Sequence, residues 1–369
     1  MKVCHISSVH DYDDVRIFVK ECSTLAKNGY DTYFVVNGDS KTINGVKIIG
    51  LGKPPKSRIK RLLSFSKKAY KVAKSLDCDV YHFHDPELLK YGKKLAKQGK
   101  KVIFDSHEDV PAQILDKTYI PKFLRKMVAK RYQRIENDVV KHLYAVVTAT
   151  SYIANKFKGR ANIVVDINNY PKLDDILFSD RPVSERQAQA CYAGGIDDLR
   201  GKTIMIKAFE EMEGKLVLAG YNIDNEDFTK YKNVSFVGTL DRKGVNDLYA
   251  DSLVGLCILM PANNYVNSKP IKLYEYMGAG IPFVCSDFPL WKELADETNA
   301  GFCVDVNDID AIREVISRLI NDRKLAETMG KNGRKFILEK YNWDIEGAKL
   351  LKLYKGIEEQ LEKESHENC

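Results

Sequence analysis

The residues best suited to bind a phosphate lie in one stretch of the chain, from Asn267 to Pro282. We expect Pro270 in the first turn of a helix, where its missing N–H leaves no hydrogen bond unmade. Ser268 and Lys269 then lie at the positive end of that helix, which favours an anion such as a phosphate. Glu275 follows one to two turns later among apolar neighbours. Its carboxylate either stabilises the local structure or accepts hydrogen bonds from sugar hydroxyls.

Three histidines lie near the ends of predicted strands in the first half of the chain. His84 follows one predicted strand directly and His107 lies just beyond the end of another, so we expect both at the carboxyl edge of a sheet, where ligands of parallel sheets bind. His82 lies inside its run, which favours a framework role. Arg16 is open to two interpretations, an ion pair with Asp14 or a contact with a bound phosphate.

Predicted strands and helices alternate along both halves of the chain. In the first half the strands are 2–6, 31–36, 46–50, 79–83, 101–105 and 145–148, and the helices are 15–27, 59–76, 87–98 and 122–142. In the second half the strands are 188–193, 215–219, 234–237, 254–259, 282–285 and 301–304, and the helices are 202–212, 244–251, 269–278, 290–295, 308–320 and 324–339. This alternation predicts an α/β protein with two Rossmann-like parallel-sheet domains that face each other across a cleft.

The domain boundaries follow from a change in composition near the middle of the chain. Residues 1–170 are predicted to form the N-terminal domain, and residues 188–342 form the C-terminal domain. Residues 171–187 are polar and rich in turn-forming residues, so they are the predicted linker. A final amphipathic stretch, residues 343–369, is predicted to be helical.

Several classes of protein are excluded by composition. The eight cysteines are scattered and form no C-x-x-C pair, so they indicate reduced thiols rather than a disulfide framework or a zinc site. No apolar run approaches the ~20 residues that span a bilayer. The start of the chain, residues 1–6, is too short and polar for a signal-peptide core, so we expect a cytoplasmic protein.

The positive charge is concentrated in the first half of the chain. The net charge is +7, but residues 1–180 hold 33 Lys and Arg against 20 Asp and Glu, a net of +13, which leaves −6 for the rest. Residues 53–74 contain nine cations and no acid. The bland interpretation is a solvated helix face, but unopposed cations favour an anionic membrane leaflet or a pyrophosphate-linked lipid. We expect no nucleic acid partner, because no stacking-aromatic arrangement accompanies the cations.

Motifs in both halves resemble those of one enzyme family. The pattern P-x-K-L-x-E-Y-M-x-x-G-x-P of residues 270–282 resembles the donor-site signature of retaining GT-B glycosyltransferases of family 4 (group 1). Residues 10–26, 80–88, 104–108 and 193–202 resemble further landmarks of that family, in the family's order. The resemblance implies a GT-B architecture, in which the N-terminal domain binds the acceptor and the C-terminal domain binds a nucleotide sugar. It also implies that the C-terminal helix returns to the N-terminal domain.

The resemblance also implies roles for particular residues. Glu275 matches the second glutamate of the family's E-x7-E motif, which holds the ribose hydroxyls, whereas Asn267 stands where the first glutamate is expected. Gly195 stands where the family usually has an arginine that clamps the diphosphate. The resemblance therefore assigns donor binding to these residues: Gly194, Gly195, Arg200, Lys202, Ser268, Lys269, Lys272 and Glu275. It assigns the catalytic positions to His107 and Asn267, and acceptor binding to His10, Arg16 and His84.

We therefore expect retaining transfer of a hexose or N-acetylhexosamine from a nucleotide diphosphate sugar, most simply UDP-linked, to a glycan or lipid-linked acceptor in surface polysaccharide assembly. The enzyme would lie on the inner face of the cell membrane. No metal or other cofactor is expected, because the D-x-D strings at 11–13, 77–79 and 308–310 do not end a strand as in metal-dependent enzymes. Two alternatives stay open: a UDP-sugar 2-epimerase on the same fold, and a non-catalytic scaffold that binds nucleotide sugar or membrane.

Overall fold

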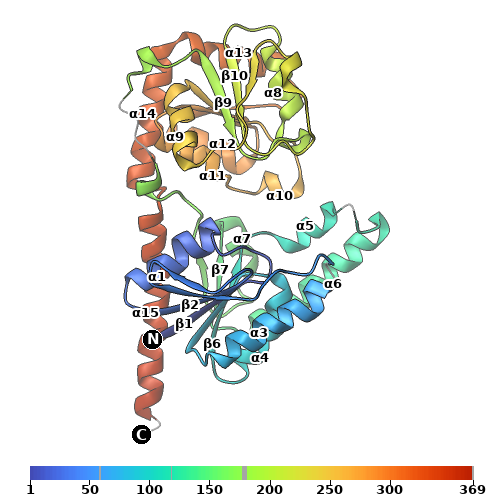
Figure 1. The fold of residues 1–369 in the computed structure, drawn as a ribbon, viewed down its shortest axis with the longest axis vertical. Helices are drawn as coiled ribbons and strands as arrows, with labels where there is room; N and C mark the ends of the chain where they lie inside the picture. The colour runs from blue at the N-terminus through green and yellow to red at the C-terminus, as the bar shows by residue number, and fades with distance from the viewer. Residues whose placement is uncertain (58–59, 118, 177–180, 368–369) are drawn as a thin grey trace. The chain divides into compact units, whose positions relative to one another are not determined.

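The computed structural model describes residues 1–57, 60–117, 119–176 and 181–367. The chain separates into two compact units (Figure 1). Unit 1 comprises Met1–Asn169 and Asp344–Cys369, and unit 2 comprises Tyr170–Trp343. The predicted linker, residues 171–187, falls within unit 2, and its residues 177–180 lie outside the described part of the chain.

Unit 1 is built on a sheet with the strand order β3-β4-β2-β1-β5-β6-β7-β8. Its strands are β1 (Lys2–Ile6), β2 (Asp31–Val36), β3 (Lys41–Ile43), β4 (Val46–Gly50), β5 (Val80–Phe83), β6 (Lys101–Ser106), β7 (Ala145–Thr148) and β8 (Val164–Asp166). Every pairing is parallel except that of β3 with β4, which is antiparallel. All the carboxyl ends of the parallel strands therefore lie at one edge, which is where a ligand is expected.

The helical segments of unit 1 before the second unit are η1 (Val15–Cys22), α1 (Ser23–Lys27), η2 (Arg61–Phe65), α3 (Ser66–Ser75), η3 (Pro86–Leu88), α4 (Leu89–Ala96), α5 (Val110–Asp116), α6 (Lys122–Val140) and α7 (Ser151–Phe157). They cover both faces of the sheet. In β2, Phe34 and Val36 pack in one hydrophobic cluster with Ile17 of η1, while Val35 packs in another with Ala69 of α3. Alternate residues of a strand point to opposite faces, so both faces are buried.

The C-terminal helix α15 (Trp343–Glu367) belongs from Asp344 onward to unit 1. Tyr354 is fully buried, and its hydroxyl lies 2.9 Å from Nδ1 of His82 in β5. Ile357 and Leu350 are also fully buried. The helix is therefore an integral part of the unit 1 core.

Unit 2 is built on a six-stranded sheet with the order β11-β10-β9-β12-β13-β14, and all its pairings are parallel. Its strands are β9 (Gln189–Ala193), β10 (Lys215–Ala219), β11 (Val234–Phe236), β12 (Val254–Cys257), β13 (Phe283–Ser286) and β14 (Gly301–Val304). Its α-helices are α8 (Lys202–Phe209), α9 (Arg242–Asp251), α10 (Asn263–Val266), α11 (Ile271–Gly278), α12 (Pro289–Thr298), α13 (Ile309–Asn321) and α14 (Arg323–Glu339). Cys191 of β9 packs into one core, and Ala190 and Tyr192 pack into the other.

The predicted fold class, two Rossmann-like parallel-sheet domains, is confirmed. The seven cysteines that the structure describes are free thiols. Among the described residues, no helix combines the length and the apolar character needed to cross a membrane.

Candidate active site

A cavity of about 360 Å³ opens at the carboxyl ends of β9 and β10 in unit 2. Gly194 follows β9, Gly220 follows β10, and Glu275 reaches the cavity from α11. The remaining lining residues are Ala193, Ala219, Tyr221, Thr239, Leu240, Asp241, Arg242, Val245 and Tyr249. The cavity thus combines the first glycine of the predicted donor site with its predicted ribose-binding carboxylate.

Two side chains from α9 hold the Glu275 carboxylate in place. Arg242 donates to Oε1 over 2.8 Å, and the Tyr249 hydroxyl donates to Oε2 over 3.2 Å. The Glu275 side chain is 11% exposed, so it still faces the cavity. A carboxylate has about four lone-pair positions, and two protein donors leave the others for a ligand hydroxyl.

Glycine is required at two positions in the wall of this cavity. Gly194 has φ +150°, and a Cβ atom there would lie 2.7 Å from Nζ of Lys272. Gly220 has φ +130°, and a Cβ atom there would lie 1.9 Å from the carbonyl oxygen of Gly194. The absence of side chains lets the two loops approach each other and brings the Lys272 ammonium group next to the backbone of Gly194.

The predicted diphosphate clamp separates into two different environments. A Cβ atom on Gly195 would lie 3.5 Å from Nε of Arg200, so the Arg200 guanidinium lies against the position where the family has its arginine. It forms an ion pair with Asp197 and remains 34% exposed. Arg200 therefore brings a cation to the place where Gly195 supplies none.

Lys202 lies in a different place and is held by acids. Its Nζ donates to Asp224 over 2.9 Å and to Glu226 over 3.1 Å, and its side chain is 5% exposed. Burial opposes its charge, but these two hydrogen bonds outweigh that effect and raise the pKa of Lys202. Lys202 was predicted to bind the donor, but in the structure its charge is already neutralised by the carboxylates of Asp224 and Glu226.

The stretch before α11 places the remaining predicted donor residues. Asn267 directly follows α10 and is half-buried. The Ser268 hydroxyl donates to the carbonyl oxygen of Tyr265, and Nζ of Lys269 lies 3.2 Å from the Tyr170 hydroxyl. The predicted helix at 269–278 begins at Ile271, with Pro270 directly before it rather than in its first turn.

In unit 1 the buried carboxylate of Asp105, at the end of β6, is the centre of a polar network. Arg16 donates from Nε and Nη2 to its two oxygens over 2.9 Å each. His107 Nε2 lies 3.0 Å from Oδ2, and His84 Nδ1 lies 3.3 Å from it. Burial alone would raise the pKa of Asp105, but Arg16 and His107 hold it well below its usual range. Asp105 therefore stays ionised and fixes the three basic side chains around it.

Within this network, Arg16 and His84 are buried and have internal hydrogen-bond partners. Arg16 is 5% exposed, and its Nη1 donates to the backbone oxygen of Ile167. The His84 side chain is fully buried, and burial lowers its pKa to about 4. Both residues, predicted to bind the acceptor, are committed here to internal partners. His107 is 18% exposed and is the member of the network that combines Asp105 contact with solvent access.

His10, the third predicted acceptor residue, borders this network. Its ring lies 5.4 Å from that of His107, and its Nδ1 lies 2.8 Å from Asp14. Burial opposes protonation of His10, but the hydrogen bond to Asp14 and the nearby Asp85 outweigh it and raise its pKa. The first alternative for Arg16, a salt bridge with Asp14, is replaced by the pair with Asp105, while Asp14 pairs with His10.

Two groups of described side chains bring potential metal ligands within 4.8 Å of one another: His5, Glu21, His82 and His84, and His84, Asp105 and His107. Neither group contains a residue of the D-x-D strings. Burial, followed by the nearby Asp105 carboxylate, raises the pKa of Glu21 well above its usual value. A protonated Glu21 would keep the first group neutral without an ion. The absence of a metal remains a prediction.

Several residues of these sites were not predicted from sequence. Asp105 is the second-last residue of a mainly apolar strand, and a carboxylate in that position is a signal for a buried partner. Arg242 and Tyr249 carry no such signal, because only the packing of α9 beside α11 directs them to Glu275.

Two family descriptions match the chain. "Glycosyl transferases group 1" matches residues 175–336, and "Glycosyltransferase Family 4" matches residues 16–165. A GDP-mannose-dependent alpha-(1-6)-phosphatidylinositol monomannoside mannosyltransferase from Mycobacterium tuberculosis is 26% identical over 126 residues, which is 34% of this chain and 33% of that protein. A capsular polysaccharide biosynthesis glycosyltransferase, CapM of Staphylococcus aureus, is 44% identical over 54 residues, 15% of this chain and 14% of that protein. The chain thus spans about a third or less of the length of these two relatives.

Solved structures with the same fold cover nearly the whole chain. Sucrose-phosphate synthase from Thermosynechococcus elongatus gives a TM-score of 0.75 at 17% identity, over 96% of this chain and 98% of its own. Anabaena HepE in complex with UDP and glucose gives a TM-score of 0.73 at 13% identity, over 96% and 100%. These similarities confirm the predicted GT-B fold.

Proposed function

Because the chain belongs to the group 1, family 4 glycosyltransferases, we propose that it transfers a hexose or N-acetylhexosamine from a nucleotide diphosphate sugar to a glycan or lipid-linked acceptor. The proposed donor is UDP-linked, the reaction retains the anomeric configuration, and the product belongs to surface polysaccharide assembly. The relatives provide a rival donor, since the name of the mycobacterial enzyme specifies GDP-mannose.

The observation that carries the proposal is the cavity of unit 2. It has about 360 Å³, within the ~300–1,000 Å³ typical of small-molecule sites. Glu275 faces it with oxygens that can accept hydrogen bonds from ribose hydroxyls. The backbone of Gly194 and Gly220 lines it without side chains, which suits close approach of a nucleotide diphosphate.

The chemistry requires cations near the leaving diphosphate. Transfer places negative charge on the diphosphate and positive charge on the anomeric carbon. Lys272 beside Gly194 and Arg200 beside Gly195 are the cations that the structure puts near the glycine loop. Such positioned charges stabilise the leaving group in place of a metal, and loss of one preorganised donor typically costs ~100–1,000-fold in rate. We therefore propose a metal-independent reaction.

In this proposal, unit 1 receives the acceptor. His107, partly exposed and oriented by Asp105, would face the reacting sugar, and Asn267 would hydrogen-bond a hexose hydroxyl. The basic segment 53–74 would hold the protein on the inner face of the membrane. In that segment Lys67, Lys71 and Lys74 are exposed, while Arg58 lies outside the described residues.

The proposal is tested with purified protein and a panel of UDP- and GDP-sugars, by following nucleotide release and sugar transfer. Donor hydrolysis or transfer with one UDP-sugar, with the anomeric configuration of the product determined by NMR, supports it. Turnover with GDP-mannose alone would show that the donor is GDP-mannose and not a UDP-sugar. Interconversion of UDP-sugar epimers would establish the epimerase, and binding without turnover of any sugar would establish the scaffold.

A further inference from the structure

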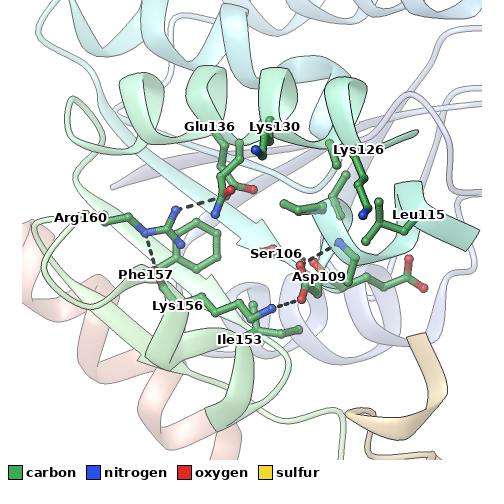
Figure 2. Close-up of a pocket in the computed structure, with 16 residues that line it drawn as sticks. Ser106, Asp109, Leu115, Lys126, Lys130, Glu136, Ile153, Lys156, Phe157 and Arg160 are labelled. Atoms are coloured by element: carbon green, nitrogen blue, oxygen red, sulfur yellow. Dashed lines mark hydrogen bonds and ion pairs between the residues drawn. The ribbon is translucent and has the colours of Figure 1, made fainter. Parts of the chain in front are cut away.

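Unit 1 contains a second cavity, of about 320 Å³, that begins directly beside His107. Ser106 and Glu108, the two neighbours of His107 in sequence, both line it. Figure 2 shows the lining residues, with Ser106 labelled. The other walls come from three helices, α5, α6 and α7. No residue predicted for the active site lines this cavity. The cavity nevertheless adjoins the His107 network, because its lining residues Ser106 and Glu108 flank His107 at the end of β6.

Ion pairs hold the walls of this cavity together. Asp109 at the start of α5 pairs with Lys156 of α7, and Arg160 beyond α7 lies 3.6 Å from the buried Glu136 of α6 (Figure 2). Arg125 donates to the backbone oxygens of Ile120 and Leu115, which ties the start of α6 to the end of α5. These contacts join the three helices around the cavity.

Two cations of the cavity are left for a ligand. Lys126 and Lys130 lie one turn apart on α6, and both line the cavity. Neither has an acidic partner among the residues that the structure describes, in contrast to Lys156 and Arg160. Residues four apart lie on the same face of a helix, so the two ammonium groups can converge on one anion. A phosphate or diphosphate is the ligand that matches this pair.

Part of the cavity lining is apolar. Val110, Leu115, Ile153 and Phe157 are among the residues that line it. Leu115 of the lining is 37% exposed, and Phe123 and Met127, which lie one turn apart on α6 outside the lining, are 82% and 60% exposed. Exposed apolar side chains in a group indicate a binding surface. A ligand with both an anionic group and a hydrocarbon chain satisfies the free lysines and this surface together.

We propose that the cavity binds the phosphate-bearing head group of a lipid-linked acceptor, with Lys126 and Lys130 at the phosphate and the lipid chain crossing Leu115, Phe123 and Met127. The inference rests on the proposed function and names the acceptor class for it. It places the sugar end of the acceptor beside His107, because the lining residues Ser106 and Glu108 flank that histidine.

The test uses farnesyl diphosphate below its micellar concentration as the lipid probe and inorganic pyrophosphate as the lipid-free probe. The first variant carries Lys126→Gln and Lys130→Gln. Its matched control carries Lys90→Gln and Lys94→Gln, an exposed pair with the same spacing on α4. A second variant carries Phe123→Ser and Met127→Ser. Circular dichroism establishes that each variant is folded before titration.

We expect the parent and the control to bind farnesyl diphosphate alike, and the lysine variant to bind it at least tenfold more weakly. The Phe123 and Met127 variant should lose affinity for farnesyl diphosphate but not for pyrophosphate. Equal binding by all four proteins, or no binding by the parent, would overturn the proposal. Pyrophosphate binding as tight as that of farnesyl diphosphate would show a free phosphate site and overturn the lipid assignment. UDP titration of the same proteins keeps the two proposals separate, because the donor cavity lies in unit 2.

Discussion

Among single residues, Arg200 and Lys202 are two cations close in sequence that lie in different environments. Arg200 remains partly exposed beside Gly195, whereas Lys202 is enclosed by Asp224 and Glu226. A cation that stabilises a leaving diphosphate needs free hydrogen-bond donors, and Arg200 retains more of them.

Arg200→Gln should therefore lower turnover by ~100-fold or more with little change in thermal stability, because it removes a charge from the reaction and not from the core. Lys202→Gln should lower the melting temperature of unit 2, since it leaves two carboxylates without their shared cation. Donor turnover and thermal unfolding of both variants check this. If both variants lose turnover equally and keep their stability, Lys202 also binds the diphosphate, as the sequence predicted.

Glu136 makes a prediction about pH. Burial raises its pKa to about 7 despite the nearby Arg160, whereas an unfolded glutamate titrates near ~4.3. Between these values the folded protein binds a proton that the unfolded chain does not, so Glu136 adds stability that fades as pH rises through 7. Relative to Glu136→Gln, the parent should gain roughly 2–3 kcal/mol of unfolding free energy as pH falls from 8 to 4.5.

Urea unfolding of the parent and of Glu136→Gln at several pH values measures this difference. Comparison with the isosteric variant removes the other titrating groups, including His84, whose lowered pKa acts in the opposite direction. Parallel stability curves for the two proteins would contradict a raised pKa at Glu136.

At the scale of elements, long runs with clear periodicity were predictable and short elements were not. The strand at 31–36 and the helical segment at 15–27 have the predicted bounds. The short helices α5 and α7 were missed, because seven residues show too little periodicity to reveal a helix. Because these helices form walls of the unit 1 cavity, the cavity could not be predicted without them.

Motif resemblance selected residues that lie together in one cavity, but it did not reveal partners that come from distant elements. Glu275 and Gly194 were predicted and do line one cavity. Nothing in the sequence reveals that Asp105 would take the Arg16 guanidinium inside unit 1, because 89 residues separate them. Tertiary packing decides such pairs.

The basic segment 53–74 carries a prediction of its own. Within the segment, Phe65, Ala69 and Ala73 are buried in the core, but Leu62 and Leu63 are 47% and 58% exposed. Binding to anionic vesicles should be mainly electrostatic, at ~1 kcal/mol per basic residue near the surface. It should fall steeply at 1 M salt, where the Debye length is about 3 Å.

Liposome co-sedimentation of the parent and of a variant with Lys67, Lys71 and Lys74 changed to Gln measures this. A control with Lys324, Lys331 and Lys335 of α14 changed to Gln removes the same charge from unit 2. The α3 variant should pellet less than the control at low salt. Pelleting of all three proteins that ignores salt would indicate hydrophobic insertion through Leu62 and Leu63 instead.

For the whole molecule, we propose that the two units divide the substrates by the chemistry of their cavities. The unit 2 cavity offers a held carboxylate and bare glycine backbone, which suit a nucleotide sugar. The unit 1 cavity offers two lysines that have no acidic partner among the described residues, beside apolar lining residues, which suit a lipid phosphate. The excess of positive charge in the first half of the chain agrees with that division.

We propose that unit 2 binds the nucleotide of a sugar donor through Glu275. Isothermal titration with UDP tests it directly, on the folded parent, on Glu275→Ala and on the control Glu293→Ala, which removes an exposed carboxylate from α12. The parent and the control should bind UDP alike, and Glu275→Ala should lose about 1.5–3 kcal/mol, the range for a hydrogen bond to a charged group. Unchanged UDP affinity in Glu275→Ala, or no binding of UDP by the parent, would contradict the account.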